Sequence, residues 1–217
     1  MTRRLSLVLS LALAIPLAPV PAPAEPIAFK MLPTYSRATF KADAPLETIV
    51  GNTAGTGVTG NLTVDPAKPQ TATGTIKVDL STLSSGVAKR DEDMRGEKYL
   101  DTANEANRFA VFEIKNVEVA GPLEPGKETA AKVSGILTIK GKPVQKVADA
   151  RVTYIQLTSD QLEKDNQKRW GFTTDNLKVR AKFATTLSDH GIPVPQILLL
   201  KLSNDILLET DLTFVKQ

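Results

Sequence analysis

The chain has 217 residues and a formal net charge of +3, with 41% apolar and 24% charged residues. These proportions are those of a globular domain, so they exclude a disordered chain and a protein that crosses a membrane many times. The sequence has one histidine and no cysteine, which excludes disulfides, a zinc centre with several histidines and a cysteine nucleophile. The fold must therefore be stabilised by its apolar core.

The N-terminal segment has the features of a secretory signal peptide. Arg3 and Arg4 supply the positive region, residues 5–20 form an apolar run, and Ala22-Pro23-Ala24 matches a small-x-small cleavage site. An uncleaved N-terminal anchor is the alternative interpretation.

We therefore expect a signal peptide at residues 1–24 and one exported domain at residues 25–217. Cleavage would remove two arginines and no acidic residue, so the net charge would fall from +3 to +1. A mature chain with so little net charge gives poor support for nucleic-acid binding.

Alternating apolar residues predict the first strands of a sheet. Residues 35–42 alternate well enough for a strand, and residues 43–56 are expected to be a polar connection with room for one helical turn. Residues 57–65 show the two-residue period of a half-buried strand, with one face formed by Val58, Gly60, Leu62 and Val64. Residues 72–80 repeat this pattern, so the two segments are expected to pair.

A charge-rich segment then interrupts the strands. Residues 84–108 include RDEDMRGEKYLD and predict a short helix and loop that cover one end of the sheet. Strand character returns at residues 109–119 and 132–140, and residues 144–157 are expected to be the long partner of the latter.

The last part of the chain predicts one helix and two more strands. Residues 159–169 are the best helix candidate, because they open with a serine or aspartate cap and are rich in Gln, Glu and Lys. Residues 177–187 are the clearest strand, and residues 206–215 form the last one. The apolar stretch at 193–202 carries no assignment. Eight strands and one or two short helices, without regular strand–helix alternation, predict an all-β antiparallel barrel.

Several motifs follow one another in the order and spacing of a known family. They are GVTGNLTVDP, TGTIKVDLSTLSSG, RDEDMR, KYLD, NRFAVFEIKNVEV and VSGILTIKGKPV, and the later RWGF and SDHGI also match. The chain resembles the YceI-like family. The resemblance implies an eight-stranded lipocalin-like barrel, exported to the periplasm, that binds a long-chain polyisoprenoid or a similar amphiphile. Family members often carry histidine near the position of Asp93 and an aromatic residue where His190 stands, so polar contacts at those positions are not carried over.

The barrel interior is the candidate binding site. An eight-stranded barrel is just wide enough inside for side chains or for one small ligand. A chain of about twenty carbons would gain roughly 16 kcal/mol on burial, before ordering costs. The alternation predicts a ligand-binding lining of Phe40, Leu62, Ile76, Phe112, Leu137, Val179, Phe183, Leu208 and Phe214. A barrel filled by its own side chains is the alternative, and a one-residue slip would reverse the face of any strand.

Candidates for catalysis are weak. No G-x-S-x-G elbow supports a triad around His190, which is expected to be a loop histidine bonded to local backbone. Asp91, Glu92 and Asp93 lie close to arginines and fit a solvated, paired helix surface better than the carboxylate pair of a glycosidase. We therefore predict a protein that is not an enzyme, with no catalytic residue, no metal and no cofactor other than the bound lipid.

The expected partners are a long-chain isoprenoid or amphiphile, a membrane surface contacted transiently, and a second copy in a homodimer. The basic row of Lys178, Arg180 and Lys182 is interpreted as a solvated strand face, with contact to anionic lipid head groups as the lesser alternative. Aromatic residues are few and do not interleave with this row, so no nucleic acid is expected.

Two other function classes stay open. An accessory module of the cell envelope without cargo would show large exposed apolar patches and an empty barrel. A lipocalin-like enzyme acting on a lipid would show a buried pair of carboxylates inside its cavity.

Overall fold

The computed structural model describes residues 25–164, 166–197 and 200–217. The predicted signal peptide at residues 1–24 lies outside the described residues. Within the described ranges, no helix is both long and apolar enough to cross a membrane.

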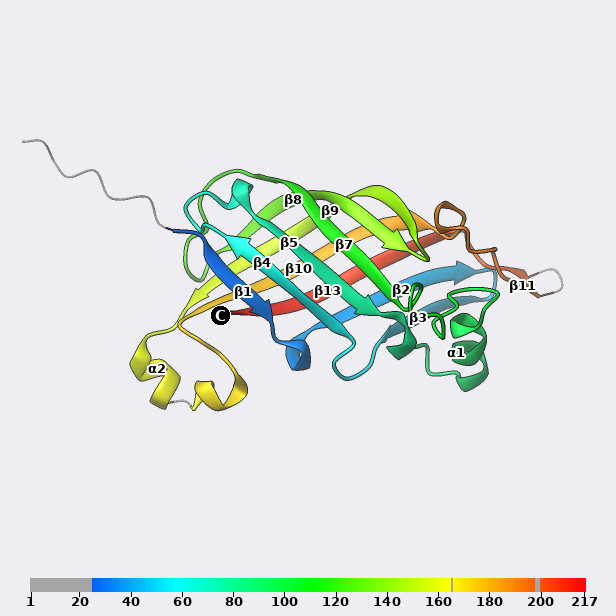
Figure 1. The fold of residues 1–217 in the computed structure, drawn as a ribbon, viewed down its shortest axis with the longest axis horizontal. Coiled ribbons are helices and arrows are strands. Elements are labelled where there is room, and N and C mark those ends of the chain that lie inside the picture. Colours follow the sequence, from blue (N-terminus) through cyan, green and yellow to red (C-terminus); the bar gives the residue numbers. More distant parts are fainter. Residues whose placement is uncertain (1–24, 165, 198–199) are drawn as a thin grey trace, which may run out of the picture.

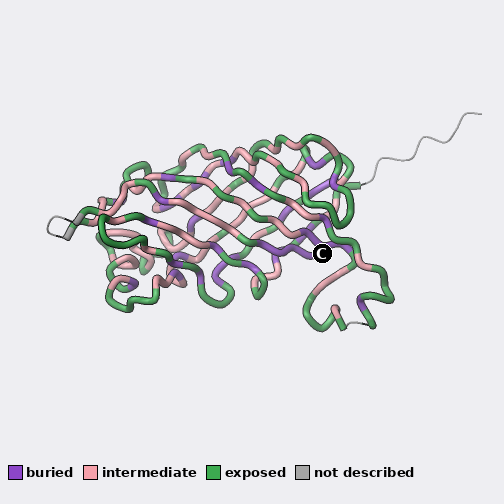
Figure 2. Tube along the Cα trace, turned by 180° about the vertical axis from the view of Figure 1, so that it is seen from behind, coloured by how far each residue is buried: buried purple, intermediate pink, exposed green. Residues whose placement is uncertain are grey.

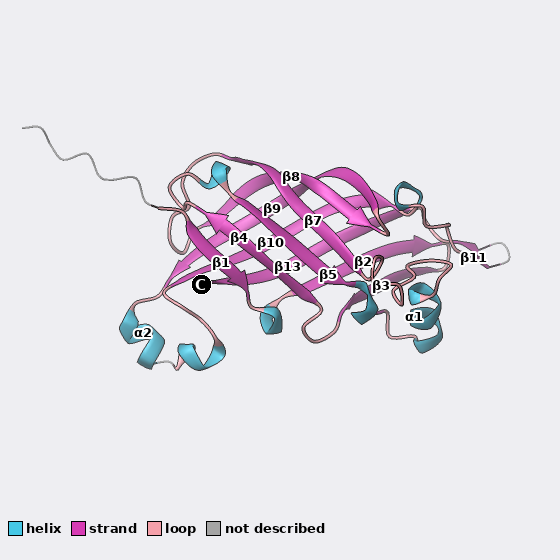
Figure 3. Cartoon of the chain, viewed as in Figure 1, coloured by secondary structure: helices cyan, strands magenta, loops and turns pink. Residues whose placement is uncertain are grey.

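Eight antiparallel strands form a closed ring (Figure 1 and Figure 3), which confirms the predicted fold class. Each predicted strand from residue 57 onward coincides with one of these strands. In order around the ring they are β1 (Ile27–Met31), β4 (Val58–Val64), β5 (Thr73–Asp79), β7 (Phe109–Val119), β8 (Glu128–Ile139), β9 (Lys142–Gln156), β10 (Asp175–Thr186) and β13 (Asp205–Lys216), which pairs with β1.

The N-terminal region begins with one strand, β1, that the alternation does not predict. β1 precedes the turn η1 (Pro33–Tyr35), and the predicted strand follows it as β2 (Arg37–Ala44). β1 and β2 both pair with β13, at its C-terminal and N-terminal parts respectively. Pro33 has no backbone N–H to donate to a ladder, so the chain turns there and two short strands lie beside one long one.

The segment at residues 43–56 is a strand and not the polar connection expected from its sequence. β3 (Glu47–Thr53) pairs with β2, and β6 (Leu83–Ser84) pairs with β3, so this sheet continues beyond the ring. Gly51 is required in β3, because a Cβ there would lie 2.3 Å from Cε1 of Phe40. A glycine that looks like a turn residue in the sequence therefore makes room for an aromatic ring.

Short helices and turns lie at the two ends of the barrel (Figure 1). At one end are α1 (Ala88–Arg95), which confirms the predicted short helix, and a separate hairpin of β11 (Gln196–Ile197) and β12 (Leu200–Lys201). At the other end is α2 (Ser159–Lys164), where a helix is also predicted. The remaining 3-10 turns are η2 (Pro69–Thr71), η3 (Leu80–Thr82), η4 (Gln167–Trp170) and η5 (Ser188–His190).

Candidate functional site

The barrel interior is divided into two groups of side chains. The first cluster consists of Phe29, Met31, Ala38, Val58, Leu62, Val64, Leu123, Tyr154, Leu177, Leu212 and Phe214, which are all buried. The second cluster has a buried part of Leu80, Leu83, Ala110, Leu137, Ile139 and Ile192, and a half-buried part of Phe40, Val78, Met94, Tyr99, Leu100, Phe112, Phe183, Leu187 and Leu208. The two clusters differ in how completely they fill the barrel.

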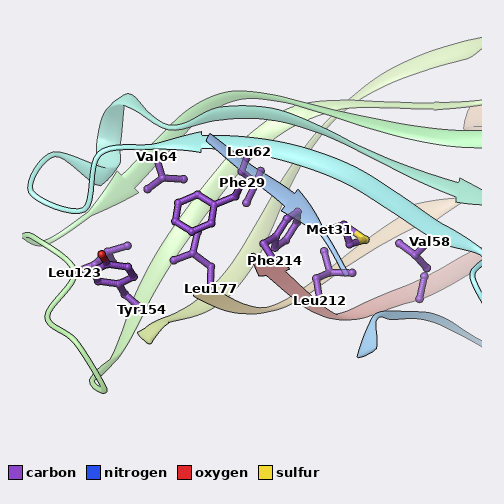
Figure 4. Packing of buried hydrophobic residues seen from close by; sticks show 11 residues of the cluster. Phe29, Met31, Val58, Leu62, Val64, Leu123, Tyr154, Leu177, Leu212 and Phe214 are labelled. Atoms are coloured by element: carbon purple, nitrogen blue, oxygen red, sulfur yellow. The ribbon is translucent and has the colours of Figure 1, made fainter. Parts of the chain in front are cut away.

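The first cluster is a solid plug at the α2 end. Phe29 and Phe214 are 0% exposed and Leu177 is 1% exposed, and Figure 4 shows these side chains converging from β1, β13 and β10. Figure 2 shows the continuous buried stretch beside the C terminus that belongs to β13. Leu123, from the loop between β7 and β8, covers this end next to Tyr154. We infer that no ligand passes through this half without displacing its core.

A polar network seals the same end. Tyr154 Oη donates to Asp175 Oδ1 at 2.5 Å, and Lys216 Nζ lies 3.2 Å from Asp175 Oδ2. Burial, followed by the hydrogen bond to Asp175, raises the pKa of Tyr154 to about 12. Burial opposes ionisation of Asp175, but hydrogen bonds from Tyr154, Thr174 and Lys216 outweigh it and hold the pKa of this carboxyl below its usual range. The network joins a carboxylate to a phenol and an ammonium, unlike the carboxylate pair of an acid–base enzyme.

The second cluster is built from two rows of inward side chains. One row runs from Phe112 of β7 to Leu137 of β8, and Ile76 of β5, opposite Phe112, continues it into the first cluster. The other crosses β2, β13 and β10 at Phe40, Leu208 and Phe183. The aromatic centroids of Phe112 and Phe183 lie only 5.5 Å apart, although β8 and β9 separate the strands of these two residues around the barrel. The two walls therefore meet across the interior at this aromatic pair.

The second cluster is less completely buried than the first. Phe40, Phe112, Phe183 and Leu208 face inward but stay half-buried. Three of them belong to strands of the closed ring, and Phe40 belongs to β2, which continues the sheet beside β13. Apolar side chains in a filled core lose this exposure, as those of the first cluster do.

The predicted lining residues thus all lie in the interior but do not form one group. The first cluster contains Leu62 and Phe214, with Ile76 and Val179 packed against it. The second contains Leu137 and the half-buried phenylalanines and leucine of the two rows. Their part in ligand binding stays a prediction.

Alternation gives no sign of three further members of the second cluster. Tyr99 and Leu100 follow α1, and Ile192 follows η5. These residues lie outside the strands, so no two-residue period marks them. Their apolar character within charged or turn-rich segments is the one signal available.

α1 is fixed over the end of the second cluster by a buried carboxylate. Asp91 accepts hydrogen bonds from Ser84 Oγ at 2.6 Å and from the backbone N–H of Ser85 at 2.7 Å. The expectation of a solvated charge surface therefore fails for Asp91, because this side chain points into the loop between β6 and α1. It holds for Glu92 and Asp93, which pair with Lys89 on the exposed side of the helix.

His190 is buried, at 1% exposure, and its ring is used for structure. Nδ1 lies 3.2 Å from the carbonyl oxygen of Lys142, and Nε2 lies 2.8 Å from Thr185 Oγ1. Burial lowers the pKa of the imidazole, so it is neutral and has one donor and one acceptor. The ring donates to the carbonyl and accepts from the hydroxyl, and neither nitrogen contacts a carboxylate as in a triad.

A hollow of about 930 Å³ lies on the outer face of the barrel. Its charged lining residues, such as Arg151 and Arg180, alternate with the inward residues of β9 and β10, so they point outward. The basic row is neutralised on the outer face of the strands: Lys178 pairs with Asp211, Arg180 with Glu128, and Lys182 lies 3.7 Å from Glu209. A smaller hollow of about 460 Å³ lies beside α2.

In the described part of the chain, no cluster of three or more His, Asp or Glu side chains could hold a metal ion.

The sequence matches one family model, the YceI-like domain, over residues 29–214. No curated protein matches the chain.

Solved structures share the fold at low sequence identity. BcnA of Burkholderia cenocepacia is 15% identical, with a TM-score of 0.60, and the match covers 82% of this chain and 95% of that one. A polyisoprenoid binding domain from Saccharophagus degradans is 14% identical, with a TM-score of 0.61 and coverage of 88% and 99%. The YCEI protein of Campylobacter jejuni is 16% identical, with a TM-score of 0.59 and coverage of 79% and 86%.

Proposed function

The chain belongs to the YceI-like family, and we propose that it binds one long polyisoprenoid, or a similar long-chain lipid, inside the α1 half of its barrel. The structural neighbour from Saccharophagus degradans is described as a polyisoprenoid binding domain. Similarity to that protein supports a lipid ligand here.

The observation that carries the proposal is the incomplete burial of the second cluster. Phe40, Phe112, Phe183 and Leu208 share one inward row or face the opposite one, and all four are only half-buried. Water in contact with this surface is unfavourable, and a lipid chain that replaces it gains roughly 0.8 kcal/mol for each buried CH₂. An isoprenoid suits the site because its methyl branches and double bonds can pack against aromatic faces.

The two ends of the barrel give the ligand a direction. The first cluster and the Tyr154–Asp175 network close the α2 end. The half-buried Met94, Tyr99 and Leu100 lie at the α1 end, where loops and a short helix cover the site. Loops rearrange at lower cost than a continuous sheet, so a lipid would enter from the α1 end.

Organic extraction tests the proposal. The full chain is purified from its own host without detergent, and native mass spectrometry is followed by extraction and lipid analysis. We expect one prenyl or other long-chain lipid per protein molecule. Repeated recovery of lipid-free protein would favour the accessory module without cargo.

We also propose that the protein carries or stores this lipid in the periplasm and is not an enzyme. The signal-like sequence of residues 1–24 supports export. Cell fractionation, with mass spectrometry of the mature N terminus, would show a periplasmic chain that begins at Glu25. A cytoplasmic chain that retains Met1 would refute export. Transient membrane contact and a homodimer stay predictions.

A further inference from the structure

β9 and β10 separate at the α1 end of the barrel. Their ladder runs from Asp175–Gln156 to Lys182–Asp149 and stops there. Beyond this point β9 continues beside β8, while β10 continues beside β13. We call the interval between residues 142–148 of β9 and residues 183–186 of β10 the seam. Its two edges belong to strands that no longer share a backbone ladder.

The turn η5 fills the seam with side chains. His190 bridges its two edges through the carbonyl oxygen of Lys142 and the hydroxyl of Thr185. Ile192, which follows η5, is 5% exposed and belongs to the second cluster. The seam therefore lies directly beside the space that we assign to the lipid.

Lys146 places a charge on the inner wall at this seam. The register of β9 puts it in phase with Val144 and Ala148, opposite Gly135 of β8. The ring of Phe112 occupies the space over Gly135, because a Cβ added to Gly135 would lie 2.6 Å from Cε1 of Phe112. The stem of Lys146 thus starts from an apolar wall, beside an aromatic member of the second cluster.

The ammonium of Lys146 reaches the border between this wall and solvent. Its Nζ lies 3.2 Å from Asp189 Oδ2 in η5, and the side chains are 16% and 42% exposed respectively. The carbon stem of this lysine lies along apolar surface, and its charge lies at the polar edge. An amphiphile is divided in the same way, with an apolar chain and a polar head group.

Asp189 is a replaceable partner. A half-exposed ion pair gains little for the fold, because solvent and salt weaken the attraction. An anionic head group attached to a buried chain would be held beside Nζ at high local concentration, whereas Asp189 can return to water. The chain thus has a cation whose present partner can give way to a ligand oxygen.

We propose that Lys146 is the head-group contact of the bound lipid, in a subsite at the solvent border of the seam that selects an anionic oxygen head, a phosphate or a carboxylate. The hydrocarbon chain lies against the second cluster. This subsite rests on the proposed function, because it requires a lipid in the α1 half of the barrel.

Three ligands with the same twenty-carbon prenyl chain test the subsite: geranylgeranyl phosphate, geranylgeranoic acid and geranylgeraniol. Affinities are measured by titration calorimetry with the full chain and with three variants. K146M keeps an unbranched side chain without charge. D189N releases the lysine from its partner, and K178M is the matched control, because Lys178 is a strand lysine that pairs with Asp211 on the outer face.

We expect the wild type to prefer at least one anionic ligand over the alcohol by about tenfold or more, since a charge-assisted hydrogen bond supplies a difference of that order. The phosphate and acid arms show which oxygen head is preferred. K146M should lose the preference while its affinity for the alcohol is retained. D189N should bind the anionic ligands more tightly, and K178M should behave as the wild type.

Two patterns would overturn the subsite. One is a K146M variant that keeps the preference for anions. The other is a D189N variant that weakens all three ligands equally, which would make the ion pair a structural tie. If K146M does not fold, the affinities of D189N for the three ligands decide the test. A wild type that binds none of the three ligands would instead refute the proposed lipid site itself.

Discussion

Two phenylalanines on neighbouring strands separate the part of the barrel that stabilises the fold from the part that binds. Phe214 of β13 is 0% exposed in the first cluster, whereas Phe183 of β10 is half-buried in the second. A phenylalanine buries about 200 Å², so complete burial corresponds to about 5 kcal/mol at roughly 25 cal/mol per Å². Phe214→Ala should therefore lower the free energy of unfolding by about 3–5 kcal/mol. Phe183→Ala should cost about 1–3 kcal/mol, because less of its surface is removed from water.

The stability that the ligand adds should be reduced in Phe183→Ala and kept in Phe214→Ala, which reverses the order of the two variants in unfolding free energy without ligand. A lipid at about one hundred times its Kd adds roughly 2.7 kcal/mol to the stability of the wild type. Phe214→Ala should keep this increment, because the first cluster does not contact the ligand. Phe183→Ala should lose about 1 kcal/mol of it or more, which is the order of an aromatic packing contact.

Equilibrium unfolding in urea, with and without geranylgeraniol, measures both quantities for each variant. The reasoning is wrong if Phe183→Ala costs as much stability as Phe214→Ala and keeps the full increment. It is equally wrong if Phe214→Ala abolishes the increment while the variant stays folded.

Three further substitutions test the polar groups. Burial lowers the pKa of His190, so the unfolded chain takes up a proton as the pH falls through 6.5 while the folded chain does not. The stability of the wild type should therefore fall between about pH 7.5 and 5. The His190→Gln variant should lack this part of the pH dependence when its unfolding in urea is measured at each pH. The lowered pKa of Asp175 gives stability that is present above its unfolded value of 3.8 and is lost as the pH falls toward the folded value. Asp175→Asn should therefore reduce the loss of stability that the protein shows as the pH is lowered through this range. An unchanged loss of stability at acid pH would contradict the network. Asp91→Ala should lower the free energy of unfolding by about 1.5–3 kcal/mol, because Ser84 and Ser85 lose a charged acceptor, and Glu92→Ala on the exposed side of α1 is its control.

Periodicity within one strand was sufficient to predict most of the barrel wall. Residues 177–187 show the strict alternation of Leu177, Val179, Ala181 and Phe183, and the structure has β10 there with these residues facing inward. The long strands carry enough repeats for the period to be read without knowledge of their partners. The segment around α1 is recognisable because it is rich in charge and lacks the two-residue period of a strand.

The features that were not predictable depend on partners far away in the sequence. β3 contains polar residues and Gly51, and it becomes a strand because β2 pairs with it and Phe40 fills the space over the glycine. β1 is only five residues long, too short for a periodic signal, and its place is set by β4 and β13.

The candidate site shows the same limit. Alternation assigns Leu62, Phe183 and Phe214 to the interior alike. Only the packing shows that Leu62 and Phe214 are buried in the first cluster, whereas Phe183 is half-buried in the second. The inward position of Lys146 was also missed, because a single lysine within a strand is ordinarily interpreted as an outward residue.

Photoaffinity labelling tests the location of the ligand most directly. A prenyl ligand with a diazirine in its chain is bound to the full-length protein, irradiated, and the labelled residues are mapped by mass spectrometry. We expect labels at Phe112, Phe183 and Leu208, with unlabelled lipid suppressing them. Labels confined to the outer groove around Arg151 and Arg180, or to the first cluster around Phe29, would contradict a lipid held in the α1 half of the barrel.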